Sequence, residues 1–216
     1  MRKVYLIVEG QGDEQALPKL LNKFVKALGL EDAVFAVAQR SSRCSDEDLR
    51  KQCADLRTRR QIAGAMFVRD CEDGCPKHEA PRMAAVLRAE KLPFPVAVVL
   101  FYREYETLFV ATLDALAGKR LVGPQGSELP PLDASASAPP DPERNRDAKG
   151  QLNKYLPKTH PYRETSHQLA MTQALDIEAL RSAALPCVGS LERALTFVLT
   201  SPVAGVYPPS PEAREA

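Results

Sequence analysis

The stretch VYLIVEGQGDE, residues 4–14, joins a run of strand-forming residues to an acidic turn that contains two glycines. The stretch AMFVRDCEDGCP, residues 65–76, has a similar apolar run followed by acids. Short apolar runs separated by helical segments are typical of parallel strands that are covered on both faces. Side chains that follow separate strands of such a sheet meet at its carboxyl edge. We therefore expect the acids after these two strands to share one site. They are Glu9, Asp70, Glu72 and Asp73.

The apolar pattern of the first half of the chain alternates between strands and helices. Ser45 and Asp48 form an acidic variant of the capping box, which predicts a helix from there to about residue 61. Alternation of this kind implies right-handed crossovers and an α/β fold. We predict an α/β domain over residues 1–116, with a four-stranded, mostly parallel sheet flanked by helices. The expected strands lie at residues 4–8, 34–38, 65–68 and 96–101.

The composition changes in the second half of the chain. Residues 105–116 have a helical pattern, and residues 117–147 are rich in proline and serine, which predicts a loop. Residues 148–216 are expected to form a C-terminal helical lobe with a proline-rich tail. Its short helices are predicted near residues 149–156, 165–180 and 190–199.

Charge and hydropathy narrow the classes of function. The chain has 216 residues and a formal net charge of +1, so a site for nucleic acid or any other polyanion must be a local patch. No apolar run approaches the roughly 20 residues that span a bilayer, which predicts a cytoplasmic protein without membrane contact. The five cysteines are irregularly spaced and odd in number, which indicates reduced thiols.

The acids after the two strands have the chemistry of a metal site. Asp70 and Glu72 are two residues apart, so extended backbone would project both to one side, and Asp73 adds a third acid. Oxygen ligands of this kind favour Mg²⁺ or Mn²⁺. Two plainer alternatives remain: a solvated acidic turn at Glu72, and acids in the turn after Glu9 that only complement a helix dipole.

Other chemistries have weaker support in the sequence. Cys71, Cys75 and His78 are suitable zinc ligands, but they do not form a C-x₂-C pair and no fourth ligand follows. His160 and His167 have no nucleophile at a diagnostic spacing. The chain also has no Walker phosphate loop and no dinucleotide fingerprint. The acidic metal site is therefore the leading hypothesis.

Several motifs, in this order, carry a resemblance to a known family. They are VEGQGDE at 8–14, DCEDGCP at 70–76, VAVVLFYREYETLFVATL at 96–113, AKGQLNKYLP at 148–157 and YRETSHQLAMTQALD at 162–176. A strand ending in VEG and a later strand ending in acid-x-acid resemble the Toprim fold of topoisomerases, primases and nucleases of the overcoming-lysogenization-defect type. The whole set resembles, more closely, a bacterial Toprim-like family of unknown function, domain of unknown function 4276.

This resemblance implies a Mg²⁺-dependent or Mn²⁺-dependent phosphodiester chemistry. Glu9, Asp70 and Glu72 would be the catalytic residues, with Glu9 as general acid/base or shared ligand. The metal would be held by these three together with Asp73. The chain departs from the usual Toprim pattern at Glu72, where the second acid is typically Asp, and the longer side chain would shift or weaken the metal.

A second group of residues extends the implied site. Glu104 and Glu106 match an acid-aromatic-acid motif of the family, and Lys149 and Lys154 match positions that are often basic and suited to a nucleic-acid backbone. Arg103 could meet a phosphate or pair with a nearby acid. The alternatives are that the two acids start a helix and that the lysines face solvent.

The function implied by the resemblance is a nuclease that acts as the effector subunit of an ATPase-associated anti-phage defence system. Its substrate would be nucleic acid, with DNA and RNA both open, and its partner an ATPase subunit; a homo-oligomer is also open. The balanced net charge argues against strong autonomous DNA affinity. The alternative is a noncatalytic Toprim-like interaction module that binds or regulates an ATPase.

Overall fold

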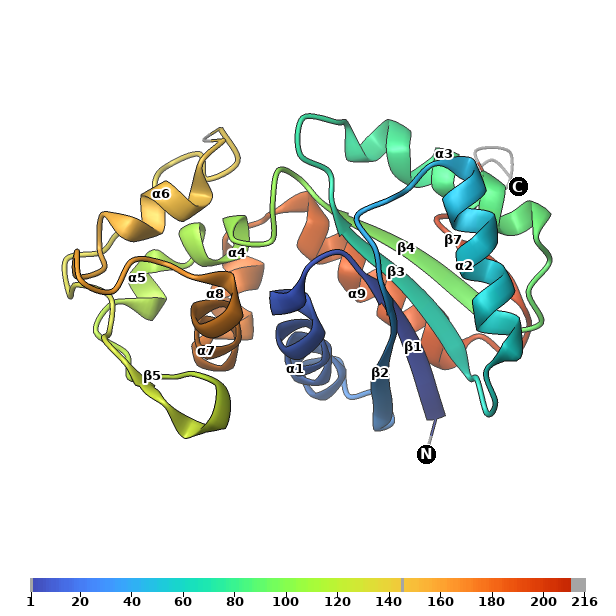
Figure 1. Ribbon diagram of the computed structural model, residues 1–216, viewed down its shortest axis with the longest axis horizontal. Coiled ribbons are helices and arrows are strands. Elements are labelled where there is room, and N and C mark those ends of the chain that lie inside the picture. Colours follow the sequence, from blue (N-terminus) through green and yellow to red (C-terminus); the bar gives the residue numbers. More distant parts are fainter. Residues whose placement is uncertain (1, 145, 211–216) are drawn as a thin grey trace.

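A five-stranded parallel sheet forms the centre of the α/β part of the chain (Figure 1). The computed structural model describes residues 2–144 and 146–210. The strands lie in the order β2-β1-β3-β4-β7. Their bounds are β1 (Arg2–Val8), β2 (Ala33–Arg40), β3 (Gly64–Asp70), β4 (Pro95–Phe101) and β7 (Gly205–Tyr207).

The prediction of a four-stranded sheet is wrong, because the tail adds a fifth strand. Gly205–Tyr207 pairs in parallel with the first three residues of β4. This strand has three residues and is followed directly by Pro208, so it has no alternating pattern that the sequence could reveal. An edge strand tolerates neighbouring proline because one of its sides makes no ladder hydrogen bonds. Residues 211–216 of the predicted tail lie outside the described residues.

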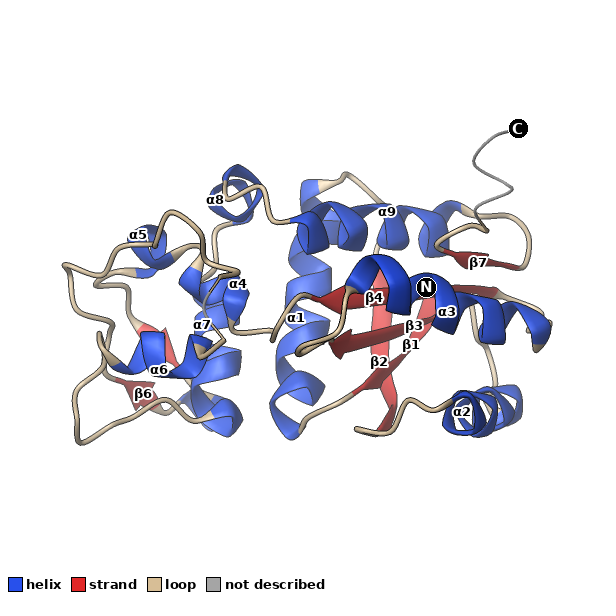
Figure 2. Ribbon diagram, turned by 90° about the horizontal axis from the view of Figure 1, so that it is seen from above, coloured by secondary structure: helices blue, strands red, loops and turns tan. Residues whose placement is uncertain are grey.

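Four helices cover the two faces of the sheet. Tyr5 and Ile7 of β1 pack toward α2 and α3, whereas Leu6 and Val8 pack toward α1 and α9. This alternation is the period of two that extended backbone imposes. Figure 2 shows α9 and α2 on opposite sides of the sheet. The four helices are α1 (Gln11–Ala27), α2 (Asp46–Thr58), α3 (Pro76–Ala89) and α9 (Pro186–Thr200).

The capping box that the sequence predicted begins α2. The Ser45 hydroxyl accepts a hydrogen bond from the Asp48 N–H at 3.2 Å, and the Asp48 carboxylate accepts one from the Ser45 N–H at 3.3 Å. Two of the free N–H groups at the helix N-terminus are thereby satisfied. The helix ends at Thr58, slightly earlier than expected.

A helical lobe is inserted between β4 and α9. The predicted single helix over residues 105–116 is two short helices, because the hydroxyl of Thr112 donates to the Leu108 carbonyl at the break between them. The predicted loop contains a small antiparallel hairpin. The elements of the lobe are α4 (Thr107–Val110), α5 (Leu113–Leu116), β5 (Leu121–Val122), η1 (Pro124–Gly126), β6 (Glu128–Leu129), α6 (Ala148–Asn153), η2 (Glu164–Gln168), α7 (Leu169–Ala174) and α8 (Ile177–Ser182).

The lobe and one face of the sheet share a continuous apolar core. Tyr105 lies edge-on to both Phe101 and Phe109, with ring centroids 5.2 and 5.5 Å apart. Its hydroxyl lies 2.9 Å from the Thr172 hydroxyl of α7. Helix α7 also packs against α1, so the lobe lies alongside that helix (Figure 1).

The order of the strands places a topological switch point between β1 and β3. From β1 the chain moves outward to β2, and it then returns to β3 on the other side of β1. The carboxyl ends of two such neighbouring strands open a crevice in which α/β proteins bind ligands. Across the described ranges of the chain, every helix is too short or too polar to cross a membrane.

Candidate active site

Carboxylates from three adjacent strands lie together at the switch point. Asp70 is the last residue of β3, Glu9 directly follows β1, and Glu104 and Glu106 follow β4. Burial raises the pKa of Asp70 well above its usual value, and the negative charges of Asp13, Glu106, Glu9 and Glu104 raise it further. We call these five residues the acidic cluster.

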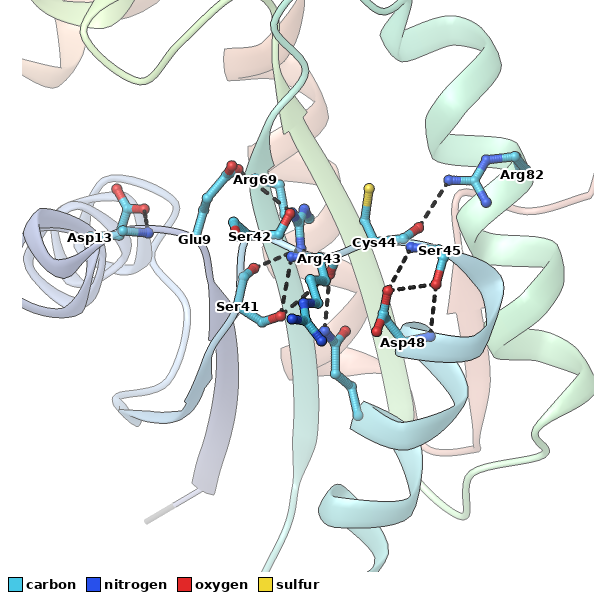
Figure 3. A network of polar contacts seen from close by, with 12 residues as sticks. Glu9, Asp13, Ser41, Ser42, Arg43, Cys44, Ser45, Asp48, Arg69 and Arg82 are labelled. Atoms are coloured by element: carbon cyan, nitrogen blue, oxygen red, sulfur yellow. Dashed lines mark hydrogen bonds and ion pairs between the residues drawn. The ribbon is translucent and has the colours of Figure 1, made fainter.

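Glu9 is held at the edge of the cluster by a buried arginine. Arg69 is only 4% exposed, and its Nη2 lies 3.8 Å from Glu9 Oε2 (Figure 3). The guanidinium donates hydrogen bonds to the carbonyls of the loop between β2 and α2, at 2.9 Å to Ser41, 2.6 Å to Ser42 and 3.0 Å to Arg43. Arg69 therefore joins that loop to the end of β1.

One oxygen of Glu9 has no hydrogen bond. Its Oε2 is buried, and no donor among the described residues reaches it. Burial raises the pKa of Glu9, although the charge of Arg69 opposes this. A buried carboxylate oxygen without a hydrogen bond is costly, and Arg69 at 3.8 Å compensates it by charge alone, so a bound cation would stabilise it further.

Asp13 joins the cluster from the first turn of α1. It accepts hydrogen bonds from the Gly10 N–H at 2.8 Å and from Gln168 Nε2 at 2.7 Å. Burial raises its pKa, and both hydrogen bonds oppose this effect. Gln168 can approach only because residue 12 is glycine: a Cβ on Gly12 would lie 1.7 Å from Gln168 Oε1.

Lys149 brings a positive charge to the cluster from α6. Its Nζ lies 3.3 Å from Glu104 Oε2 and 4.0 Å from Glu106 Oε1, and it also forms an ion pair with Glu164. Burial lowers the pKa of Lys149, but the three carboxylates, Glu106 foremost, raise it overall. Lys149 is thus engaged by acids of its own chain.

Glu106 is the most buried acid of the cluster, with 2% exposure. Its Oε1 accepts a hydrogen bond from the Tyr162 hydroxyl at 2.8 Å. Burial raises the pKa of Glu106 to about 7, against the opposing effects of Lys149 and Tyr162. A carboxyl group that titrates near neutral pH is suited to general acid/base chemistry.

Two of the predicted metal ligands, Glu72 and Asp73, lie at the rim, the solvent-exposed edge of the acidic cluster. Asp73 is exposed and pairs with Arg103 Nη1 at 2.7 Å and with Arg146 Nη2 at 3.3 Å. Glu72 is also exposed and has a positive φ of 43°. Its charge raises the pKa of Glu9, so it lies within electrostatic range of that residue. The structure thus brings Glu9 and Asp70 together with Glu104 and Glu106, and it turns Asp73 toward arginines.

The possible metal ligands of the cluster are of the chemical type that hard divalent cations prefer. They are carboxylate oxygens only, which suits Mg²⁺ or Mn²⁺. The unsatisfied Glu9 Oε2 is a further indication. Within the described ranges, no three His, Cys, Asp or Glu side chains are arranged as a ready metal-binding group, and this includes Cys71, Cys75 and His78. On chemistry, Glu9 and Asp70, with Asp13 beside them, are the residues that would hold the ion.

Besides Arg69, the sequence analysis did not select four residues of this site: Asp13, Tyr162, Glu164 and Gln168. Asp13 is part of the VEGQGDE stretch, where its position in a first helical turn suggested a dipole role only. The other three belong to YRETSHQ, about 150 residues further along the chain. They lie in one of the motifs that carry the family resemblance, which was a signal for them. The sequence pattern does not show, however, that this segment packs against α1.

Comparison with known proteins yields a family but no characterised relative. No curated protein matches the chain, and no solved structure does. A family model described as Domain of unknown function (DUF4276) matches residues 8–196. This span begins one residue before Glu9 and includes the whole acidic cluster. The chain therefore belongs to the DUF4276 family.

Proposed function

We propose that this protein is a Mg²⁺-dependent or Mn²⁺-dependent nuclease of the Toprim type, which hydrolyses phosphodiester bonds at the acidic cluster. The observation that carries the proposal is the environment of Asp70. Four other acids raise its pKa, and in the described part of the chain its carboxylate has neither an ion pair nor a hydrogen bond. A divalent cation would relieve this repulsion.

The residues of the cluster have different roles in the proposed reaction. Glu9 and Asp70 would hold the ion, and Arg69 keeps Glu9 in place. A bound ion would supply Lewis-acid activation of water and of the phosphoryl group. Glu106, with a pKa of about 7, is able to accept or donate a proton near neutral pH. Glu72 lies at the rim, where it could contact substrate or complete the ligand set.

The Toprim relationship has support from the arrangement of the sheet. Strands β2, β1, β3 and β4 are adjacent and parallel, and the acids follow β1 and β3. We further propose that an ATPase subunit brings the nucleic acid to this site as part of anti-phage defence. A net charge of +1 offers few phosphate neutralisations to the chain alone, so delivery by a partner would compensate.

Calorimetric titration with Mg²⁺ and Mn²⁺ tests the metal site. Wild-type protein should bind the ions, and D70N should lose at least tenfold in affinity because its ligand is removed. D73N is the matched control: it removes one acid from the same turn, but one that pairs with Arg103 and Arg146. We expect D73N to bind the ions as wild type does. An absence of binding to wild type, or equal binding to all three proteins, would refute the site.

Turnover is tested separately with supercoiled DNA and single-stranded RNA in the presence of Mn²⁺ at low ionic strength, which compensates for the weak nucleic-acid binding expected of the chain alone. E9Q and D70N should both abolish cleavage, and D73N should retain it. Cleavage that persists in D70N would come from a contaminant or from another site.

A noncatalytic interaction module is the second candidate. The observation in its favour is that Glu72 and Asp73, two of the four expected metal ligands, lie exposed at the rim. This alternative predicts that D70N and wild type do not differ in ion binding, so the same titration separates the two.

A further inference from the structure

We propose that Lys149 provides, as a fixed ammonium group, the positive charge that a second divalent ion would otherwise bring, so that the acidic cluster holds one ion and not two. This inference depends on the proposed function, and it specifies how many ions that function uses.

The first argument is the position of the ammonium group. Lys149 Nζ lies among the carboxylates of Glu104, Glu106 and Glu164, at 3.3 and 4.0 Å from the first two and in an ion pair with the third. The ammonium group donates a hydrogen bond to Glu164, and its charge is shared with Glu104 and Glu106 at ion-pair distance. The half of the cluster that Glu104 and Glu106 form therefore already contains a cation.

The second argument is the way in which the backbone fixes Lys149. The Ala148 N–H donates to Glu104 Oε1 at 2.9 Å, and the Gly150 N–H donates to the N-cap Asp147 at 2.7 Å. Both neighbours of Lys149 are therefore held. An exposed lysine normally loses considerable side-chain entropy when it forms an ion pair. This lysine is presented to the carboxylates by a backbone that is already ordered.

The third argument is the distribution of exposure around the ammonium group. The Lys149 side chain is 39% exposed, whereas Glu104 is 18% and Glu106 is 2% exposed. The lysine is thus the more exposed partner in both of these ion pairs. An incoming ion would have to displace it, or to lie beside a like charge in a poorly screened place.

The other half of the cluster has a cation only at Glu9, where Arg69 lies, and none at Asp70 among the described residues. Asp70 has no ion pair within the described ranges, and Arg69 lies 3.8 Å from Glu9 while donating to three loop carbonyls. The cluster is therefore divided. Within the cluster Lys149 pairs with Glu104 and Glu106, and Glu9, Asp13 and Asp70 are left for one exogenous ion.

The experiment counts bound Mn²⁺ by equilibrium dialysis and by the electron paramagnetic resonance of the free ion. Wild type should bind one ion. K149M, which removes the charge and keeps an unbranched chain of similar length, should bind a second ion. K149R keeps a positive charge and should bind one. K154M is the matched control, since Lys154 follows the same helix and its Nζ donates only to Gln151 in the described structure; it should bind one ion.

The outcomes separate the inference from the function on which it depends. Two ions in wild type, or one ion in a folded K149M, would overturn the inference and leave the nuclease proposal intact. No ion in wild type would overturn both. If circular dichroism shows K149M to be unfolded, wild type and K149R still test the inference. Two bound ions in either protein would contradict the claim that the charge of residue 149 replaces a second ion.

Discussion

Glu72 and Arg103 form an antiparallel backbone pair beyond the ends of β3 and β4, and both have a positive φ. The Glu72 N–H donates to the Arg103 carbonyl at 2.8 Å, and Arg103 Nη1 reaches back to the Glu72 carbonyl at 3.4 Å. The φ angles are 43° and 66°. A non-glycine residue in this left-handed region costs about 1 kcal/mol, and such strain gathers at functional sites. Here the positive φ angles turn the two segments that follow β3 and β4, beside the acidic cluster.

Substitution of Glu72 tests this strain. E72G should be more stable than E72A by about 1 kcal/mol, because glycine adopts a positive φ without steric cost. Urea denaturation measures the difference. Asp73 is the control, since its φ is not positive: D73G should be the less stable of the pair D73G and D73A. Equal stability of E72G and E72A would show that the turn is unstrained.

Replacement of Arg69 tests the connection between the loop and β1. R69K should lower the free energy of unfolding by about 3 kcal/mol. A lysine ammonium group cannot replace the guanidinium group, which donates to three loop carbonyls and pairs with Glu9. Thermal and urea denaturation measure the loss. R120K, at an exposed ion pair with Glu128, should change stability by less than about 0.5 kcal/mol. Similar small effects at both positions would contradict a structural role for Arg69.

Gly12 provides a steric test of the contact between the lobe and α1. G12A should lower stability by about 1–3 kcal/mol, because its Cβ would lie 1.7 Å from Gln168 Oε1. Q168A in the G12A background should recover part of this loss. G189A, in the interior of α9, is the control: its nearest neighbour is the flexible end of Arg193, so alanine should be neutral or stabilising. The absence of any recovery in the double variant would place the strain elsewhere.

Glu106 gives stability a defined dependence on pH. Its pKa rises from the usual 4.5 in the unfolded chain to about 7 in the folded protein, chiefly through burial. Between these values the folded state binds the proton more tightly, so its contribution to stability is present below pH 4.5 and decreases up to about pH 7. The full loss is about 3 kcal/mol.

Urea denaturation of wild type and E106Q across this pH window checks the prediction. The stability of wild type relative to E106Q should fall as pH rises and then become constant. E128Q, at an exposed position, should show no such trend. A constant difference between wild type and E106Q would refute the shift.

The sequence predicted the first four strands because each is a near-continuous apolar run, and it predicted the start of α2 because Ser45 and Asp48 act locally. It did not predict β7, whose three residues pair with β4 only through tertiary structure. It also missed the break at Thr112, where a side-chain hydroxyl competes for backbone carbonyls. The sequence pattern thus predicted the elements whose determinants lie within the element itself.

The same distinction applies to the site. Glu9 and Asp70 could be placed together because strand ends in a parallel sheet converge. The engagement of Lys149 by Glu164 could not be foreseen, since it depends on how α6 and η2 fold against each other. The outward turn at Asp73 likewise depends on Arg103 and Arg146, which come from other segments.

The pairing of β7 with β4 has a consequence for synthesis on the ribosome. The hydrogen-bonding edge of β4 stays unsatisfied while the roughly one hundred residues of the lobe and α9 are being translated, and an open edge can recruit a strand from a neighbouring nascent chain. Only the emergence of Gly205–Tyr207 closes it. Ribosomes that stall within the lobe should therefore release aggregation-prone products.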